Sequence, residues 1–197
     1  SPPAKEYAFA LAKIAESYIR YGQVDTTAAL PLIRQAIKID SKSEEIYLIA
    51  GDIYMIFNEG TIAIKNYNLA QYANPNSPTA NMKIGWVYVK GRALTSAIQR
   101  FDEAISLDPN YAPAYRELGQ VYWSANRLEQ SKENFKKYLE LTEGNIPAKT
   151  RYVNSLFYAG DYDEVIKNVE EILQVDKSRS YMNRLAGYSS YEKKNAD

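Results

Sequence analysis

Apolar residues recur three or four positions apart along most of the chain, the spacing that places side chains on one face of an α-helix. Between residues 44 and 57 the pattern is carried by Tyr47, Ala50, Gly51 and Tyr54. Polar residues interrupt it at 58–60. A second helical pattern then follows, with Ala63, Tyr67 and Ala70, and it ends at Pro75. The pattern predicts two helices joined by a short turn.

The same helix pair returns at a fixed interval. Gly51, Gly85 and Gly119 lie 34 residues apart, each is followed three residues later by a tyrosine, and the glycine reappears two periods on as Gly187. The third unit repeats the plan with Ile84, Gly85, Tyr88, Ala97, Phe101, Ala104 and Pro109. The fourth repeats it with Tyr115, Leu118, Gly119, Tyr122, Ser131 and Phe135. A fixed period of this length predicts a stacked array of helical hairpins.

These residues resemble the tetratricopeptide repeat, in which a tryptophan-like residue, Leu-Gly and Tyr are followed by Ala, Phe and Pro. The resemblance implies an all-α fold, a right-handed α-α superhelix or solenoid of antiparallel helix pairs, and a non-enzymatic protein. We expect a single array across residues 1–197. Its repeats fall at about 8–43, 44–77, 78–111, 112–145 and 146–179, with an unpaired terminal helix at 180–194.

Residue size at the repeated positions predicts how each pair of helices crosses. Glycine in the first helix and alanine or serine in the second let the helices approach closely, and large aromatic residues fill the volume beyond. The outer units depart from this plan. The fifth has Val153 and Val165 where small residues are expected. In the first, the pattern predicts a packed face made of Leu11, Ile14, Ala15 and Tyr18.

The terminal helix at 180–194 has no partner helix after it. It ends with apolar and aromatic residues where such arrays usually carry a polar cap; these are Tyr181, Leu185, Tyr188 and Tyr191. This favours a fragment of a longer protein. The alternative is that the helix is itself the cap, with tyrosines amphipathic enough to face water.

Composition excludes several classes of function. Lysine plus arginine and aspartate plus glutamate number 24 each, so we expect no nucleic-acid partner. Cysteine and histidine are absent, which argues against metal sites and cofactors that need those side chains and against catalysis built on them. No stretch approaches the ~20 apolar residues that span a bilayer. We expect a soluble chain without membrane insertion, and of the compartments left open we favour a bacterial periplasm or cell surface.

The resemblance implies a concave groove lined by the first helix of each pair. Carried over position by position, it predicts a ligand groove made of Asp52, Met55, Met82, Trp86, Val89, Lys90, Arg116, Gln120, Trp123, Asn154, Phe157, Tyr158, Arg184, Tyr188 and Tyr191. Aromatic residues with a polar group are enriched where proteins bind other molecules. The alternative is that these rings fill the seam between neighbouring first helices.

Some proteins of this family hold a peptide's terminal carboxylate between basic and amide side chains on successive first helices. Arg116, Asn154 and Arg184 occupy comparable positions, with Gln120 one turn beyond Arg116. Charge-assisted hydrogen bonds from such groups would bind a carboxylate. The set is incomplete in the second and third units, and ordinary solvated charge is the alternative explanation.

Three functions follow, in order of preference. The first is a non-enzymatic scaffold that binds a peptide segment of a partner protein, with Trp86, Trp123, Phe157 and Tyr158 as apolar anchors. The second is carbohydrate or small-ligand binding, or assembly, in a bacterial cell-envelope system, which the 18 tyrosines suggest. The third is homotypic assembly through residues 180–194.

Overall fold

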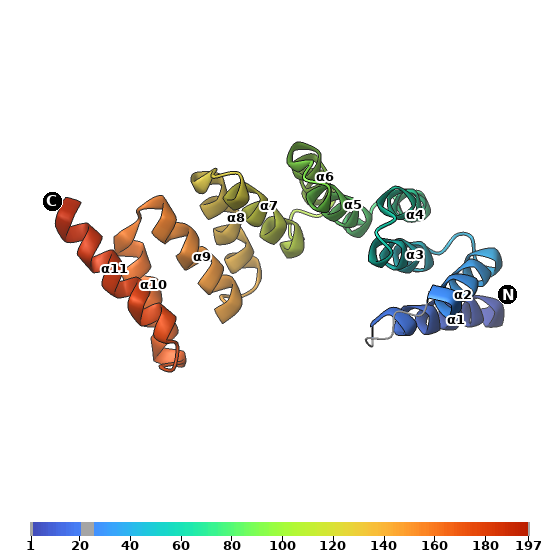
Figure 1. Cartoon of the computed structure of the whole chain (residues 1–197), viewed down its shortest axis with the longest axis horizontal. Coiled ribbons are helices and arrows are strands. Elements are labelled where there is room, and N and C mark those ends of the chain that lie inside the picture. Colours follow the sequence, from blue (N-terminus) through green and yellow to red (C-terminus); the bar gives the residue numbers. More distant parts are fainter. Residues whose placement is uncertain (1, 21–25, 197) are drawn as a thin grey trace. The chain divides into compact units, whose positions relative to one another are not determined.

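The computed structural model describes residues 2–20 and 26–196, and every regular element in this part of the chain is a helix (Figure 1). The helices are α1 (Pro2–Arg20), α2 (Thr26–Ile39), α3 (Glu44–Ile56), α4 (Gly60–Ala73), α5 (Pro78–Lys90), α6 (Leu94–Leu107), α7 (Ala112–Ser124), α8 (Leu128–Leu141), α9 (Ile146–Ala159), α10 (Tyr162–Val175) and α11 (Ser180–Ala196). The predicted all-α class is confirmed.

Contacts between helices divide the chain into two compact units. The first ends at Pro109 and holds α1 to α6, and the second begins at Asn110 and holds α7 to α11. In the first unit α1 packs on α2, α3 on α4 and α5 on α6; α2 also packs on α3, and α4 on α5. In the second unit α7 packs on α8, α8 on α9, α9 on α10 and α10 on α11. Within each unit, the second helix of one pair therefore supports the first helix of the next.

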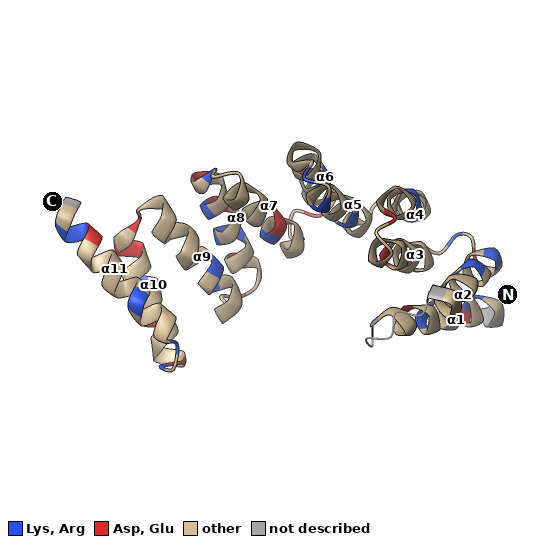
Figure 2. Cartoon of the chain, viewed as in Figure 1, with Lys and Arg blue, Asp and Glu red and all other residues tan. Residues whose placement is uncertain are grey.

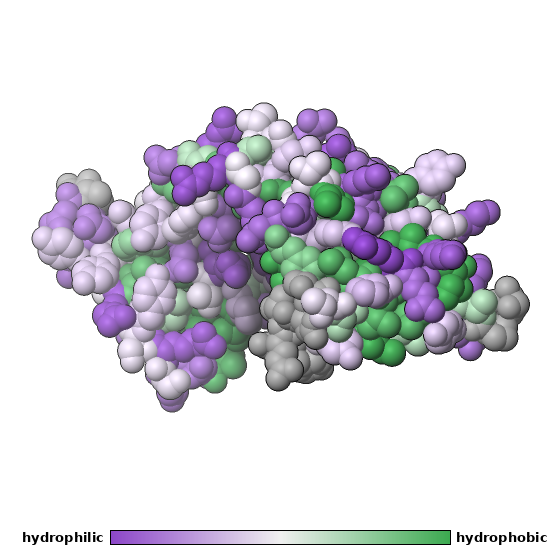
Figure 3. All heavy atoms as spheres, turned by 45° about the vertical axis from the view of Figure 1, so that its right-hand side comes forward, coloured by the Kyte–Doolittle hydropathy of each residue, from purple (hydrophilic) through white to green (hydrophobic). Residues whose placement is uncertain are grey.

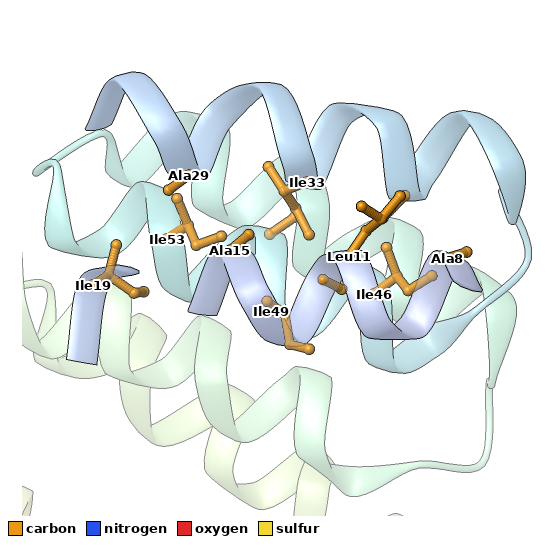
Figure 4. Close-up of a cluster of buried hydrophobic side chains, with 12 residues drawn as sticks. Ala8, Leu11, Ala15, Ile19, Ala29, Ile33, Ile46, Ile49 and Ile53 are labelled. Carbon is orange, nitrogen blue, oxygen red and sulfur yellow. The ribbon is translucent and has the colours of Figure 1, made fainter. Parts of the chain in front are cut away.

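The core at the start of the first unit comes from α1, α2 and α3 (Figure 4). On α1 the buried apolar residues are Ala8, Leu11, Ala12, Ala15 and Ile19. Ile14 and Tyr18, which the sequence placed on this face, are instead 46% and 40% exposed. The prediction is confirmed for Leu11 and Ala15 and was wrong for Ile14 and Tyr18. Because α1 packs on both α2 and α3, its buried stripe runs through Ala8, Ala12 and Ile19 instead. In Figure 3, apolar residues, coloured green, are visible at the surface of the first unit.

An aromatic ring from the second helix lies directly over the glycine of the first. In the third hairpin, a Cβ atom on Gly85 would lie 2.5 Å from Cε1 of the buried Phe101. The other crossings repeat this geometry, at 2.2 Å for Gly51 against Tyr67 and 2.7 Å for Gly119 against Phe135. The predicted tight crossing is confirmed, with one addition: glycine makes room for the ring itself as well as for the neighbouring helix.

The fifth hairpin solves the same crossing with other residues. Val153 replaces the glycine, and Val169 stands where the earlier hairpins have a ring. Both valines and Val165 are fully buried in one apolar cluster. A smaller residue on the second helix leaves the volume that the larger residue on the first helix occupies, so total volume is conserved. This explains how the hairpin tolerates its departure from the repeat pattern.

The turns of the second to fifth hairpins share one backbone form. Asn58, Arg92, Asn126 and Gly160 lie 34 residues apart and all have left-handed backbone, with φ of 59°, 58°, 56° and 86°. After each, the next residue donates its N–H to a carbonyl five residues back; in the third hairpin Ala93 N and Tyr88 O are 2.9 Å apart. This bond satisfies a carbonyl at the helix end. The sequence predicted these turns, but not that they are identical.

Arg92 is the least suited of the four to this backbone, because left-handed conformation is strained for a residue with a Cβ and is tolerated best by glycine and asparagine. Arg92→Gly should therefore raise the free energy of unfolding by about 0.5 to 1 kcal/mol. Urea unfolding followed by circular dichroism measures this change. Gly160→Ala, at the equivalent turn, should lower stability, and equal effects of both substitutions would contradict the assignment.

Candidate ligand groove

In the first unit, the predicted groove residues lie on α3 and α5. Asp52 is already engaged within the fold: its Oδ1 accepts the Tyr67 hydroxyl at 2.7 Å and the Lys83 ammonium at 2.7 Å. Burial, together with the charge and hydrogen bond of Asp52, raises the pKa of Tyr67 far above its ordinary value. The phenol therefore stays protonated and donates. Asp52 joins α3, α4 and α5, and we assign it no ligand contact.

Of the remaining groove residues of the first unit, Trp86 and Lys90 are exposed, whereas Met55, Met82 and Val89 are partly buried. Trp86 on α5 is 45% exposed. Lys90 and Met55 approach each other, with Lys90 Nζ 3.5 Å from the Met55 carbonyl oxygen. They border a cavity of about 260 Å³ whose lining is Met55, Asn58, Gly60, Val87, Lys90 and Gly91. Val87 was not predicted, because the resemblance did not place its position in the groove.

In the second unit, the structure brings aromatic residues of α7 and α9 together. The rings of Trp123 and Tyr158 meet edge to face with centroids 4.6 Å apart. The ring centroid of Phe157 lies 5.5 Å from that of Tyr158 and 5.9 Å from that of Tyr162, and both pairs also meet edge to face. Such contacts stabilise the rings by about 0.5 to 1.5 kcal/mol beyond burial. Tyr158 nevertheless remains 57% exposed, so the cluster both fills the seam between the helices and presents an aromatic surface.

Polar side chains adjoin this cluster. A cavity of about 150 Å³ is lined by Gln120, Trp123, Phe135, Arg151 and Asn154. Arg151 Nη1 lies 3.5 Å from Gln120 Oε1, and the Tyr181 hydroxyl of α11 donates to Asn154 Oδ1 at 2.8 Å. The three first helices of this unit, α7, α9 and α11, are therefore connected by polar contacts across one face.

The structure changes which arginine belongs to this polar group. Arg116, predicted from the sequence, is paired with Glu117, at 2.6 Å between Nη2 and Oε1. Arg151 lines the cavity instead, although the family pattern did not place it in the groove. Two features of the sequence could have indicated Arg151: α9 carries basic but no acidic residues, and Arg151 lies one turn before Asn154.

On α11, the predicted residues Arg184, Tyr188 and Tyr191 are all exposed. Burial and the nearby Tyr158 raise the pKa of the Tyr181 hydroxyl, while Arg184 opposes the rise. Tyr181 therefore lies near both the aromatic cluster and a positive charge. Tyr188 and Tyr191 extend along the same helix but make no ring contact with the cluster among the described residues.

Two kinds of site are not found in the described part of the chain. No helix there is long and apolar enough to cross a membrane. Among the same residues, no group of three or more aspartate, glutamate, histidine or cysteine side chains is arranged to hold a metal ion.

A stack of helix pairs with a repeated crossing and a repeated turn defines a helical-repeat protein. Residues 93–126 match the family model of the TPR repeat, and residues 112–145 match that of the tetratricopeptide repeat. Residues 93–145 therefore carry tetratricopeptide repeats, and these matches support assignment of the chain to that family. The search of curated proteins gave no match.

Solved structures of other tetratricopeptide repeat proteins share the fold. The pilF protein of Pseudomonas aeruginosa has a TM-score of 0.73 at 18% identity, over 98% of this chain and 93% of that one. YrrB, described as a TPR protein with an unusual peptide-binding site, has 0.69 at 20% identity, over 83% and 84%. PilW, a type IV pilus biogenesis factor, has 0.70 at 20%, over 87% and 79%. At these identities the similarity concerns the fold.

Proposed function

We propose that the protein is a non-enzymatic scaffold whose first helices bind a segment of a partner protein. The observation that carries this proposal is the aromatic cluster of Trp123, Phe157 and Tyr158 with polar groups beside it. Rings with a polar edge are the side chains most often found at the centre of protein interfaces. The similarity to YrrB, which has a peptide-binding site by its description, supports the same conclusion.

In the first unit, Trp86 supplies a second exposed aromatic surface on α5. We propose that it is an anchor as well, with Met55, Met82, Val89 and Lys90 as its neighbours on the first helices. Each unit then carries one of the two tryptophans of the chain on its own proposed binding surface, so tryptophan fluorescence reports on binding directly.

Truncating either tryptophan should weaken binding strongly. Burial of one such anchor contributes about 1.5 to 3 kcal/mol, so Trp86→Ala or Trp123→Ala should each raise Kd by about 10- to 150-fold. The partner is captured from the native source on the immobilised chain, and its binding to each variant is measured by titration calorimetry. Circular dichroism verifies that helicity is kept.

Tyr72→Ala is the matched control, since this tyrosine is 87% exposed on α4, a second helix. It should leave Kd unchanged. Wild-type affinity in the double variant Trp86→Ala with Trp123→Ala would refute the proposed binding face.

We further propose a bacterial periplasmic or cell-surface location. The fold shared with PilW, a type IV pilus biogenesis factor, supports this proposal. Fractionation of the source cells with an antibody against the chain distinguishes this location from the cytoplasm.

A further inference from the structure

Charge in the second unit is segregated between its two sets of helices. The first helices, α7, α9 and α11, carry six basic residues and two acidic ones, Glu117 and Glu192. The second helices, α8 and α10, carry four lysines and seven acidic residues. Figure 2 shows the positions of both signs. The helices that carry the aromatic cluster are therefore net positive, although the whole chain is neutral.

Some of these basic side chains are neutralised within the fold. Arg116 pairs with Glu117, Lys149 pairs with Glu171 of α10, and Lys193 pairs with Asp163 of α10. Such pairing leaves little positive charge available for a ligand from these three residues.

Arg151 and Arg184 have no ion pair among the described residues. Arg151 Nη1 lies 3.5 Å from the neutral amide oxygen of Gln120, and Arg151 lines the cavity together with Trp123. Arg184 lies close enough to Tyr181 to oppose the rise of its pKa. Arg151 thus lies beside Trp123 in the cavity, and Arg184 follows Tyr181 by three residues on α11, where the Tyr181 hydroxyl donates to Asn154 of α9. α9 carries no acidic residue to neutralise them.

We propose that this face of the second unit selects a partner segment with aspartate or glutamate side chains next to a large apolar residue. The inference rests on the proposed function and specifies the kind of side chains that the bound segment carries. The apolar side chain would pack on Trp123 and Tyr158, and the carboxylates would accept charge-assisted hydrogen bonds from Arg151 and Arg184. Asn154 and Gln120 would supply further hydrogen-bonding groups. Repulsion would exclude a basic segment.

The test selects random twelve-residue peptides, with both ends chemically blocked, on the full chain at low salt. The expected bound pool is enriched in acidic residues beside aromatic or aliphatic ones. For one selected peptide, changing its glutamates to glutamine should raise Kd about 10-fold or more, since a hydrogen bond to a charged group contributes about that much. Added salt should weaken the parent peptide but not its glutamine form.

Charge reversal on the protein tests the same contacts. The double variant Arg151→Glu with Arg184→Glu should reverse the selection, so that lysine and arginine become enriched. The matched control is Lys136→Glu with Lys167→Glu, which makes the same change in net charge on α8 and α10. The control should retain the acidic preference.

The outcomes separate the two proposals. Bound peptides without acidic enrichment, or a reversal also produced by the control variant, would overturn the acidic preference and leave the binding face standing. If the blocked peptides are not selected but the same pool with free carboxyl ends is, the arginines are assigned to a terminal carboxylate, and this result would also overturn the acidic preference. A third outcome is that no peptide is selected and that the tryptophan variants still capture the partner as the wild type does. This outcome would contradict both the proposed binding surface and its acidic preference.

Discussion

Phe101→Ala should lower the free energy of unfolding by about 3 to 5 kcal/mol. The Phe101 ring is fully buried and lies over Gly85, where no Cβ is present to fill the space that it would leave. The neighbouring Ala97 and Ala104 are also buried and too small to close the cavity. Removing the ring therefore lowers the free energy of unfolding in two ways. The favourable free energy of burying the ring is lost, and so are the contacts that its neighbours made with it. Urea unfolding followed by circular dichroism measures the change.

Leu107→Ala is the matched control for that experiment, because this leucine lies on the same helix and is partly exposed. It should cost much less than Phe101→Ala. If the two variants unfolded at the same urea concentration, Phe101 would not hold the hairpin together as described.

The second large effect concerns the glycine beneath the ring. Gly85→Leu should lower the free energy of unfolding by about 3 kcal/mol, the upper end of the usual cost of overpacking. Even the first added carbon would lie 2.5 Å from the ring, and a fully buried ring cannot move without displacing α6. Equilibrium unfolding at fixed temperature gives the difference from wild type.

Gly187 offers a control of opposite sign. It occupies the equivalent position on α11, and a Cβ there would meet no atom within 4 Å. Gly187→Ala should therefore stabilise the chain, because alanine is favoured over glycine in a helix by about 0.5 to 1 kcal/mol. Gly85→Ala should destabilise it. The same sign for these two alanine substitutions would be incompatible with the crossing geometry.

The repeated features of the fold were predictable because each repeat confirms the others. The spacing of Gly51, Gly85 and Gly119 predicted the close crossing, since glycine at the same point of each unit indicates that atoms of the second helix approach closely there. At the beginning of the chain, the spacing of apolar residues did not predict every buried position. There Ile14 and Tyr18 continue the apolar spacing but face outward, because the orientation of α1 depends on its contacts with α3 rather than on its own pattern.

The candidate groove was predictable only in outline. Its aromatic members follow from their position in the repeat, and the structure brings Trp123, Phe157 and Tyr158 together. The state of each charged side chain depends on long-range partners that spacing does not reveal. Asp52 is held by Lys83, which lies 31 residues away in sequence, and Arg116 by its immediate neighbour. Arg151, outside the family pattern, is the residue left facing the cavity.

The identical backbone of the four hairpin turns has a consequence for engineering. Because Asn58, Arg92, Asn126 and Gly160 adopt the same left-handed conformation with the same capping bond, the connector of one hairpin should be transplantable into another. A chimera carrying the residue 160 connector at residue 92 would keep the handedness of the chain reversal there. Loop grafting of this kind could install an epitope or a fluorophore site at a chosen hairpin while leaving the helices as they are.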